Sequence, residues 1–258
     1  MINTNGKKGF FRRGENMNVG LIFAGGTGVR MNTNTKPKQF LELDGKAIII
    51  YTIEVFETHP EIDAIVVVCL EEWIPYLQQL IKETDIKKIV KVIPGGKNTQ
   101  ESQYLGLSEI NSWDNTKENT VVLIHDGVRP LVDQDTITRN IRSVEKNGTA
   151  ITVVPSIETV IYVDETECLN EVIDRKKCRM ARAPQSYRLG EILEVHNKAI
   201  MDNRLDFIDS ACMMQAYNKR LNTVEGNDDN IKITTPKDYY LFKALVEAQK
   251  NSKNTRSK

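Results

Sequence analysis

Short runs rich in Val and Ile alternate with longer amphipathic segments, and this alternation restricts the fold more than any other feature of the sequence. Strands that are covered on both faces read as continuous apolar runs. Repeated strand–helix–strand units therefore predict an α/β fold, with a Rossmann-like, layered, mostly parallel sheet and helices on both faces. The expected strands are Val19–Ala24, Ile62–Leu70, Ile89–Ile93, Thr120–His125 and Ala150–Pro155, and the expected helices are Ala47–Thr58, Glu71–Thr84, Gln100–Ile110 and Asp133–Asn147.

Residues 156–183 interrupt this rhythm with two short alternating runs, Thr159–Val163 and Leu169–Asp174. The segment is too long for a simple loop and too thin to form its own core. We therefore expect a protruding β-arm that packs on a second subunit to form a homodimer. After the arm we expect helices at Leu189–Met201 and Ile208–Tyr217, strands at Leu221–Glu225 and Ile231–Thr234, and a last helix from Pro236.

Composition and charge limit the possible partners and the compartment. The 35 basic residues balance the 35 acidic ones, so no overall field attracts nucleic acid or an anionic membrane. No apolar run approaches the roughly 20 residues that cross a bilayer. The four cysteines form no CxxC pair and the three histidines are scattered, which favours a reducing, cytoplasmic location and argues against a zinc site. We expect one domain over residues 17–250, with a disordered extension at 1–16 and a disordered tail at 251–258.

A glycine-rich segment follows the first expected strand, reading A-G-G-T-G-V-R-M over residues 24–31. Glycines let backbone N–H groups approach phosphate oxygens, and Arg30 and Lys38 bring two cations to the same place. A Rossmann dinucleotide motif would need a third glycine where Met31 stands, and a P-loop motif is absent. A triphosphate site is thus favoured over a simple tight turn before a helix.

Two later segments also carry charged residues in apolar surroundings. His125-Asp126-Gly127-Val128-Arg129-Pro130 stands at the carboxyl end of an expected central strand, where open α/β sheets bind ligands. An ion pair between Arg129 and Asp126 is the alternative to a ligand contact, and His125 is expected to be structural. Lys232, within Asn230-Ile231-Lys232-Ile233-Thr234, is costly in an apolar strand unless its ammonium meets an anion. Exposure on an edge strand is the alternative.

Two further segments read P-K-Q-F at residues 37–40 and P-G-G-K-N-T-Q-E-S at residues 94–102. Together with the three segments described above, they resemble the cytidylyltransferases that act on methylerythritol phosphate and ribitol phosphate. The resemblance runs roughly from Asn18 to Ala248, with the motifs in the order of the family. It implies a nucleotidyltransferase fold of the GT-A-like kind. It also implies that CTP and a sugar-alcohol phosphate are the substrates, and that Mg²⁺ is held mainly by the CTP phosphates.

The resemblance also implies roles for individual residues. Three cations would act on the phosphates during catalysis: Arg30, Lys38 and Lys232. Seven residues would bind CTP: Ala24, Gly25, Gly26, Gly28, Gly96, Ser102 and Asp126, of which Gly96 and Ser102 read the cytosine. Four would bind the acceptor: Asp126, Arg129, Thr159 and Arg175, with Arg175 reaching the acceptor of the neighbouring subunit. No residue is assigned as a metal ligand.

Several positions depart from the pattern of the family. Thr99 stands where the family often has arginine, and Gly127-Val128 replaces two alanines. Asp209 matches an aspartate of the family, although Ile208 and Cys212 replace its Thr and Ser. Asp209 could therefore belong to the active site or cap the following helix.

The implied reaction is an in-line attack of the acceptor's phosphate oxygen on the α-phosphorus of CTP, which releases pyrophosphate. Ribitol 5-phosphate, for teichoic acid or capsule synthesis, is the favoured acceptor. Methylerythritol phosphate, for isoprenoid synthesis, and glycerol phosphate are the alternatives. Two other classes stay open: a nicotinamide-dependent reductase on a similar sheet, which the missing third glycine disfavours, and a nucleotide-binding module without activity.

Overall fold

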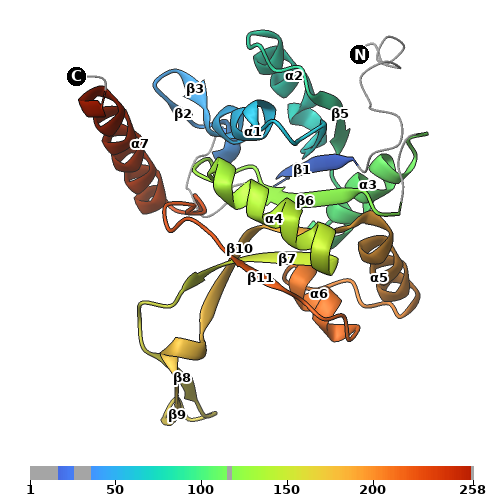
Figure 1. The fold of residues 1–258 in the computed structure, drawn as a ribbon, viewed down its shortest axis with the longest axis vertical. Coiled ribbons are helices and arrows are strands. Elements are labelled where there is room, and N and C mark those ends of the chain that lie inside the picture. Colours follow the sequence, from blue (N-terminus) through green and yellow to red (C-terminus); the bar gives the residue numbers. More distant parts are fainter. Residues whose placement is uncertain (1–16, 26–35, 115–117, 257–258) are drawn as a thin grey trace.

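A computed structural model describes residues 17–25, 36–114 and 118–256. Its centre is a seven-stranded sheet in the order β11-β7-β10-β6-β1-β4-β5 (Figure 1). Four neighbouring strands are parallel, and β10 runs antiparallel to both of its neighbours. The mostly parallel α/β sheet expected from the sequence is therefore confirmed. The strands are β1 (Asn18–Ala24), β4 (Ala64–Cys69), β5 (Ile89–Pro94), β6 (Val121–Asp126), β7 (Thr149–Pro155), β10 (Arg179–Arg188) and β11 (Thr223–Glu225).

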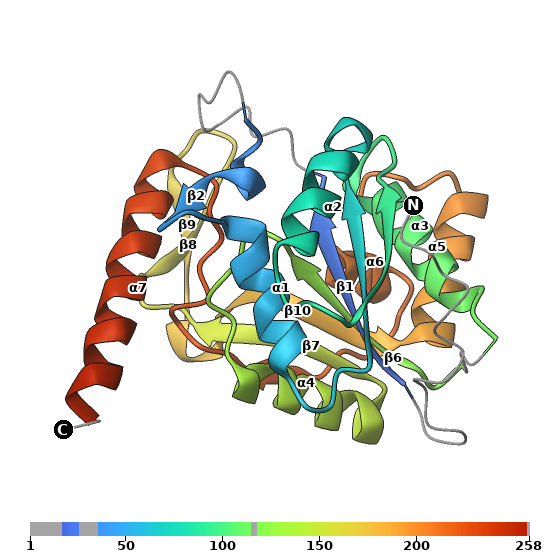
Figure 2. The ribbon, with the colours of Figure 1, turned by 90° about the horizontal axis from the view of Figure 1, so that it is seen from above.

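Helices cover both faces of the sheet (Figure 2). Successive residues of a strand point to opposite faces, and β1 follows this rule: Ile22 packs in one core, whereas Leu21 packs in the other. The first core lies under α1 (Ile48–Thr58), α2 (Ile74–Lys82) and α4 (Gln134–Asn147). The second lies under α3 (Thr99–Asn111), α5 (Leu189–Met201) and α6 (Ser210–Ala216). The expected alternation of helices and strands thus buries both faces.

The last helix, α7 (Pro236–Arg256), lies beside the layered body rather than on the main sheet (Figures 1 and 2). It packs through Phe242 and Val246 in a third core that also contains Ile233 and Leu43. Leu43 belongs to β2 (Glu42–Leu43), which forms a small hairpin with β3 (Lys46–Ala47). The helix runs into residues 251–258, where we expected a disordered tail. That segment has neither Gly nor Pro to stop a helix.

The β-arm expected at residues 156–183 extends away from the body (Figure 1). Its hairpin consists of β8 (Val160–Val163) and β9 (Leu169–Ile173), which pair antiparallel. Asp164 closes the turn by accepting hydrogen bonds from the backbone N–H groups of Thr166 and Cys168. The arm carries exposed apolar side chains, namely Ile157, Ile161, Tyr162, Val163, Leu169, Val172 and Met180.

Two expectations about strands were wrong. Residues 231–234 form no strand, because the N–H of Ile233 donates to the carbonyl of Val128 in a loop rather than to a neighbouring strand. Conversely, β10 was not expected, since proline is normally excluded from a central strand. Its Pro184 lies where pairing with β7 shifts register between Ala181 and Gln185, so that its missing N–H interrupts no ladder bond.

Candidate active site

A pocket of about 550 Å³ lies at the carboxyl ends of the parallel strands β1, β5 and β6. It brings together most of the residues singled out in the sequence, although they come from segments far apart in the chain. The predicted site residues on its wall are Ala24, Gly25, Lys38, Gly96, Ser102, Asp126, Arg129 and Lys232, and Asp209 also lines it. Gly26, Gly28 and Arg30 lie outside the described residues.

The motif at residues 37–40 is anchored by its last two side chains. Phe40 is fully buried and stacks on Trp73, with 5.0 Å between the ring centroids. The amide nitrogen of Gln39 donates to the carbonyl oxygen of Ala24 at 2.6 Å, which ties the motif to the end of β1. With these two residues held, Lys38 lies on the wall of the pocket that Ala24 and Gly25 also line.

The segment from Gly95 to Ser102 is folded by its own hydrogen bonds. The hydroxyl of Ser102 accepts from the N–H of Gly96 at 3.0 Å and donates to the carbonyl of Asn98 at 2.8 Å. Asn98 caps α3 by accepting from the N–H of Glu101. A side chain on Gly96 would come within 2.4 Å of Glu101, so this position needs glycine. Ser102, predicted to contact the base, thus also shapes the loop that lines the pocket.

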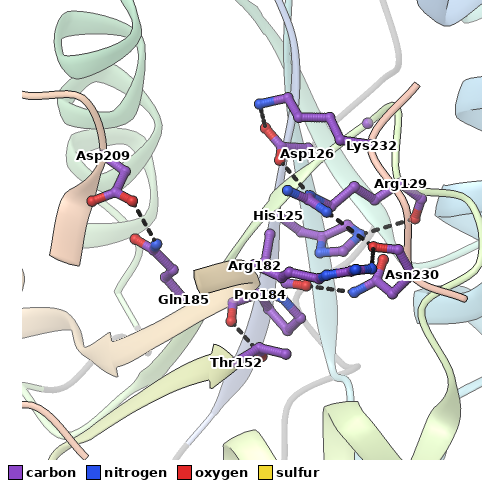
Figure 3. Close-up of polar contacts among 12 residues, drawn as sticks. His125, Asp126, Arg129, Thr152, Arg182, Pro184, Gln185, Asp209, Asn230 and Lys232 are labelled. Atoms are coloured by element: carbon purple, nitrogen blue, oxygen red, sulfur yellow. Dashed lines mark hydrogen bonds and ion pairs between the residues drawn. The ribbon is translucent and has the colours of Figure 1, made fainter. Parts of the chain in front are cut away.

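Asp126 lies at the centre of an ion-pair network (Figure 3). One carboxylate oxygen is 2.8 Å from Nε of Arg129, and the other is 2.9 Å from Nζ of Lys232. Burial alone would raise the pKa of Asp126, but the charges of Lys232 and Arg129 outweigh burial and lower it well below its ordinary value. The carboxylate is therefore ionised throughout the neutral range. The ion pair of Arg129 with Asp126, one of the two alternatives from the sequence, is present.

Lys232 reaches the pocket because its neighbours are anchored elsewhere. Ile233 is fully buried against α7, and Thr234 and Thr235 bond the carboxylate of Asp238 in the first turn of that helix. Lys232 is therefore held on the opposite side of the segment and meets the carboxylate of Asp126. Its ammonium thus meets a carboxylate, its contact with phosphate stays a prediction, and the segment is a loop rather than a strand.

His125 is structural, as expected. Its ring is buried, and Nε2 lies 3.1 Å from the carbonyl oxygen of Arg129. Burial lowers the pKa of His125 to about 4, so the ring is neutral at physiological pH. Asp209 caps α6, because its carboxylate accepts from the N–H of Cys212 and also from the side-chain amide of Gln185. Capping of the helix, one of the two alternatives left open, is therefore present, and the residue also lines the pocket.

The two arm residues assigned to the acceptor do not line this pocket. Thr159 is exposed, and Arg175 donates to the carbonyl of Ile157 at 2.8 Å within the arm. Sequence reasoning also missed residues that the structure places in the site. Gln39 bonds the backbone of Ala24 and Gln185 bonds Asp209 in the wall of the pocket. Arg182 donates to the carbonyl oxygen of Asn230 beside the ion pairs of Asp126. Gln39 and Asn230 stand within recognised motifs, whereas no local pattern marks Arg182.

Comparison with known proteins identifies the family to which the chain belongs. The family model of IspD, 2-C-methyl-D-erythritol 4-phosphate cytidylyltransferase, matches residues 19–248. The ribitol-5-phosphate cytidylyltransferase of Vibrio parahaemolyticus is 50% identical over 91% of this chain and 98% of its own length. That of Streptococcus agalactiae serotype III is 47% identical over the same shares. A 2-C-methyl-D-erythritol 4-phosphate cytidylyltransferase of Clostridium botulinum is 37% identical over 88% of this chain and 96% of its own length.

Solved structures share the fold. The 4-diphosphocytidyl-2C-methyl-D-erythritol synthase of Anaerococcus prevotii superimposes with a TM-score of 0.79 at 23% identity, covering 90% of this chain and 96% of the other. The 2-C-methyl-D-erythritol 4-phosphate cytidylyltransferase of Francisella tularensis gives 0.71 at 28% identity, covering 89% and 98%. Together with the match over residues 19–248, these likenesses place the chain in a known family. The chain belongs to the IspD family of cytidylyltransferases.

Proposed function

We propose that this cytidylyltransferase transfers CMP from CTP to ribitol 5-phosphate, forming CDP-ribitol and pyrophosphate. The observation that carries the choice of acceptor is the similarity of 46–50% to four proteins named ribitol-5-phosphate cytidylyltransferase. Three relatives named for 2-C-methyl-D-erythritol 4-phosphate are 36–37% identical, and a fifth protein named for ribitol 5-phosphate is 37% identical. CDP-ribitol is an activated donor for teichoic acid or capsule polymers, which is the pathway we propose. The methylerythritol phosphate reaction of isoprenoid synthesis is the competing assignment.

The chemistry requires two anions to meet, and the pocket supplies cations for this purpose. An oxygen of the acceptor's phosphate attacks the α-phosphorus of CTP, a new P–O bond forms, and the bond to the β-phosphate breaks to release pyrophosphate. A phosphate monoester is already largely ionised at neutral pH, so no side chain needs to remove a proton. Lys38 and Lys232, together with Arg30, would stabilise the charge that develops on the phosphates. Ala24 and Gly25 would lie against the phosphates of CTP, and Gly96 and Ser102 against its base.

Mg²⁺ would neutralise part of the triphosphate charge when bound. Among the residues that the structure describes, no three His, Cys, Asp or Glu side chains gather as a metal site. Asp126 could accept a hydrogen bond from water on a phosphate-bound ion, yet both of its oxygens already pair with cations. We therefore propose that the CTP phosphates supply most of the ligands to the ion.

We further propose a homodimer in which the arm completes the site of its partner. Support comes from the exposed apolar side chains of β8 and β9 and from the position of Arg175 outside the pocket of its own chain. An apolar hairpin of this kind is stabilised when a second surface covers it. Arg175 and Thr159 would then contact the acceptor at the interface, Arg175 in trans.

Location in the cytoplasm is also proposed. The four cysteines are free, and Cys168 and Cys212 are exposed, as suits a reducing compartment. No helix in the described part of the chain is long and apolar enough to cross a membrane.

The proposed activity is tested by identifying the product. Purified enzyme is incubated with CTP, Mg²⁺ and ribitol 5-phosphate, and the mixture is analysed by mass spectrometry and by pyrophosphate release. We expect CDP-ribitol and pyrophosphate in equal amounts, and we expect EDTA to stop the reaction. Binding of CTP without product from any polyol phosphate would contradict the assignment and favour a nucleotide-binding module.

A further inference from the structure

Two guanidinium groups meet at one backbone oxygen in the pocket (Figure 3). Nη1 of Arg182 donates to the carbonyl oxygen of Asn230 at 2.8 Å, and Nη1 of Arg129 donates to the same oxygen at 2.9 Å. Arg182 also donates to the carbonyl of Asp228 at 2.9 Å. Like charges are thus held close together at the wall of the active site, where both residues line the pocket.

The two arginines differ in how their charge is balanced. Arg129 pairs with the carboxylate of Asp126, which it shares with Lys232. The described residues place no carboxylate in an ion pair with Arg182, whose two hydrogen bonds go to backbone carbonyls through a single nitrogen. Burial, followed by the charge of Arg129, lowers the pKa of Arg182. The guanidinium nevertheless stays charged at neutral pH.

Asp126 pairs with two of the three cations on this wall. The charges of Asp228 and Asp229 offset part of the charge of Arg182, but neither residue lines the pocket. The wall therefore presents three cations to the pocket, which favours an anion such as a phosphate monoester. A guanidinium is planar and can donate two parallel hydrogen bonds to phosphate oxygens. Both nucleotide and acceptor carry phosphate, so charge alone does not distinguish them.

The backbone beside Arg182 is held from two sides. The side-chain amide of Asn230 donates to the carbonyl of Ala183 at 2.7 Å, and the hydroxyl of Thr152 donates to the carbonyl of Pro184 at 2.6 Å. Both bonds are buried. The segment that carries Arg182 is therefore fixed before a ligand arrives, which reduces the ordering cost of binding.

Resting on the proposed function, we propose that Arg182 is a binding residue for the phosphate of the acceptor, acting with Arg129 of the same subunit. The phosphate of the acceptor is favoured over that of CTP because Arg182 clusters with Arg129 and Asn230. Ala24, Gly25 and Lys38, which we propose for the phosphates of CTP, line another part of the pocket. Arg182 would add its charge and its unused N–H groups to that phosphate.

The test compares Arg182→Met and Arg182→Lys with wild type in steady-state assays, varying ribitol 5-phosphate and CTP separately. For Arg182→Met we expect the KM for ribitol 5-phosphate to rise at least tenfold and the KM for CTP to change less than twofold. Arg182→Lys should recover part of the loss, since it restores charge without the planar fork. Melting temperatures establish that each variant is folded.

Arg139→Met is the matched control. Arg139 is exposed, donates to the backbone carbonyl of Glu225 at 2.9 Å and does not line the pocket. The control loses a guanidinium–carbonyl hydrogen bond, as Arg182→Met does, and should keep both KM values. An unchanged KM for the acceptor in Arg182→Met, or an equal rise for CTP, would overturn the assignment of Arg182. Absence of turnover by the wild type with every acceptor would instead overturn the proposed function.

Discussion

Lys232 and Asp126 are 106 positions apart in the chain, yet Nζ of the lysine lies 2.9 Å from a carboxylate oxygen of the aspartate. This contact joins the segment before α7 to the carboxyl end of β6. The side chain of Lys232 is 42% exposed, so an incoming phosphate can reach it. In our account Asp126 holds Lys232 in place until the phosphates bind.

Replacing Lys232 with methionine tests this role. We expect kcat/KM to fall at least about 100-fold, because a cation that stabilises transition-state charge is lost. Stability should change by less than about 1 kcal/mol, since the ion pair is partly exposed. Lys250→Met is the control, because Lys250 pairs with Asp44 away from this pocket. Normal turnover of Lys232→Met would remove Lys232 from the catalytic residues.

Mixed dimers test whether the arm acts across subunits. Arg175→Ala and Lys38→Ala should each be nearly inactive as homodimers, because each site lacks one phosphate contact. If Arg175 serves the neighbouring site, a mixed dimer contains one site with both residues intact. Mixing the two variants should then restore up to about a quarter of wild-type activity, from statistical pairing and one intact site in each mixed dimer. With subunit exchange verified by tagged chains, absence of recovery would refute action in trans.

Gly127 is required by a close approach of two backbone segments. A Cβ atom there would lie 2.7 Å from the carbonyl oxygen of Phe23, which accepts a hydrogen bond from the N–H of Gly127. Gly127→Ala should therefore destabilise the fold by roughly 1–3 kcal/mol and displace the neighbouring Asp126. Gly25→Ala is the control for stability, because its Cβ would meet none of the described residues within 4 Å. Equal melting temperatures for the two variants would contradict the predicted clash.

Stability should decrease in mild acid because of buried histidines. Burial lowers the pKa of His196 to about 4, and neither ring nitrogen has a hydrogen-bond partner. The unfolded chain binds the proton near pH 6.5 and the folded one near pH 4, so stability is lost as pH falls between these values. At pH 5 the loss from His196 amounts to about 2 kcal/mol.

His196→Leu separates this loss from other titrations. Its melting temperature at pH 7.5 reports the change in packing, and the further decrease from pH 7.5 to pH 5 should be smaller than in wild type. Carboxylates and His125 titrate in both proteins, so their contributions to the decrease in melting temperature cancel in the comparison. The same decrease in both proteins would show that His196 does not contribute.

Much of the fold could be predicted from local pattern. The Val/Ile runs predicted strands and the amphipathic segments predicted helices. A strand that is buried on both faces needs apolar residues throughout, and a helix that covers a sheet needs one apolar face. The strand β10 could not be found in this way, since the tolerance for Pro184 depends on a register shift against β7. Residues 231–234 have the alternation of a strand, yet Ile233 is buried against α7 and no strand pairs with the segment.

The candidate site also contains residues that could be predicted from the sequence and residues that could not. Gly96 and Asp126 stand in motifs at strand ends, so their convergence in one pocket follows from a parallel sheet. Arg182 becomes part of the site only through tertiary contacts between β10 and the segment before α7, which contains Asn230. A single sequence carries no local signal for such contacts.

Competition between acceptors tests the central claim most directly. The enzyme receives limiting CTP with equal concentrations of ribitol 5-phosphate and 2-C-methyl-D-erythritol 4-phosphate, and the two CDP products are separated and counted. The product ratio equals the ratio of the two kcat/KM values. We predict that CDP-ribitol exceeds the other product at least 100-fold. A ratio near one, or an excess of the methylerythritol product, would contradict the assignment of ribitol 5-phosphate as the acceptor.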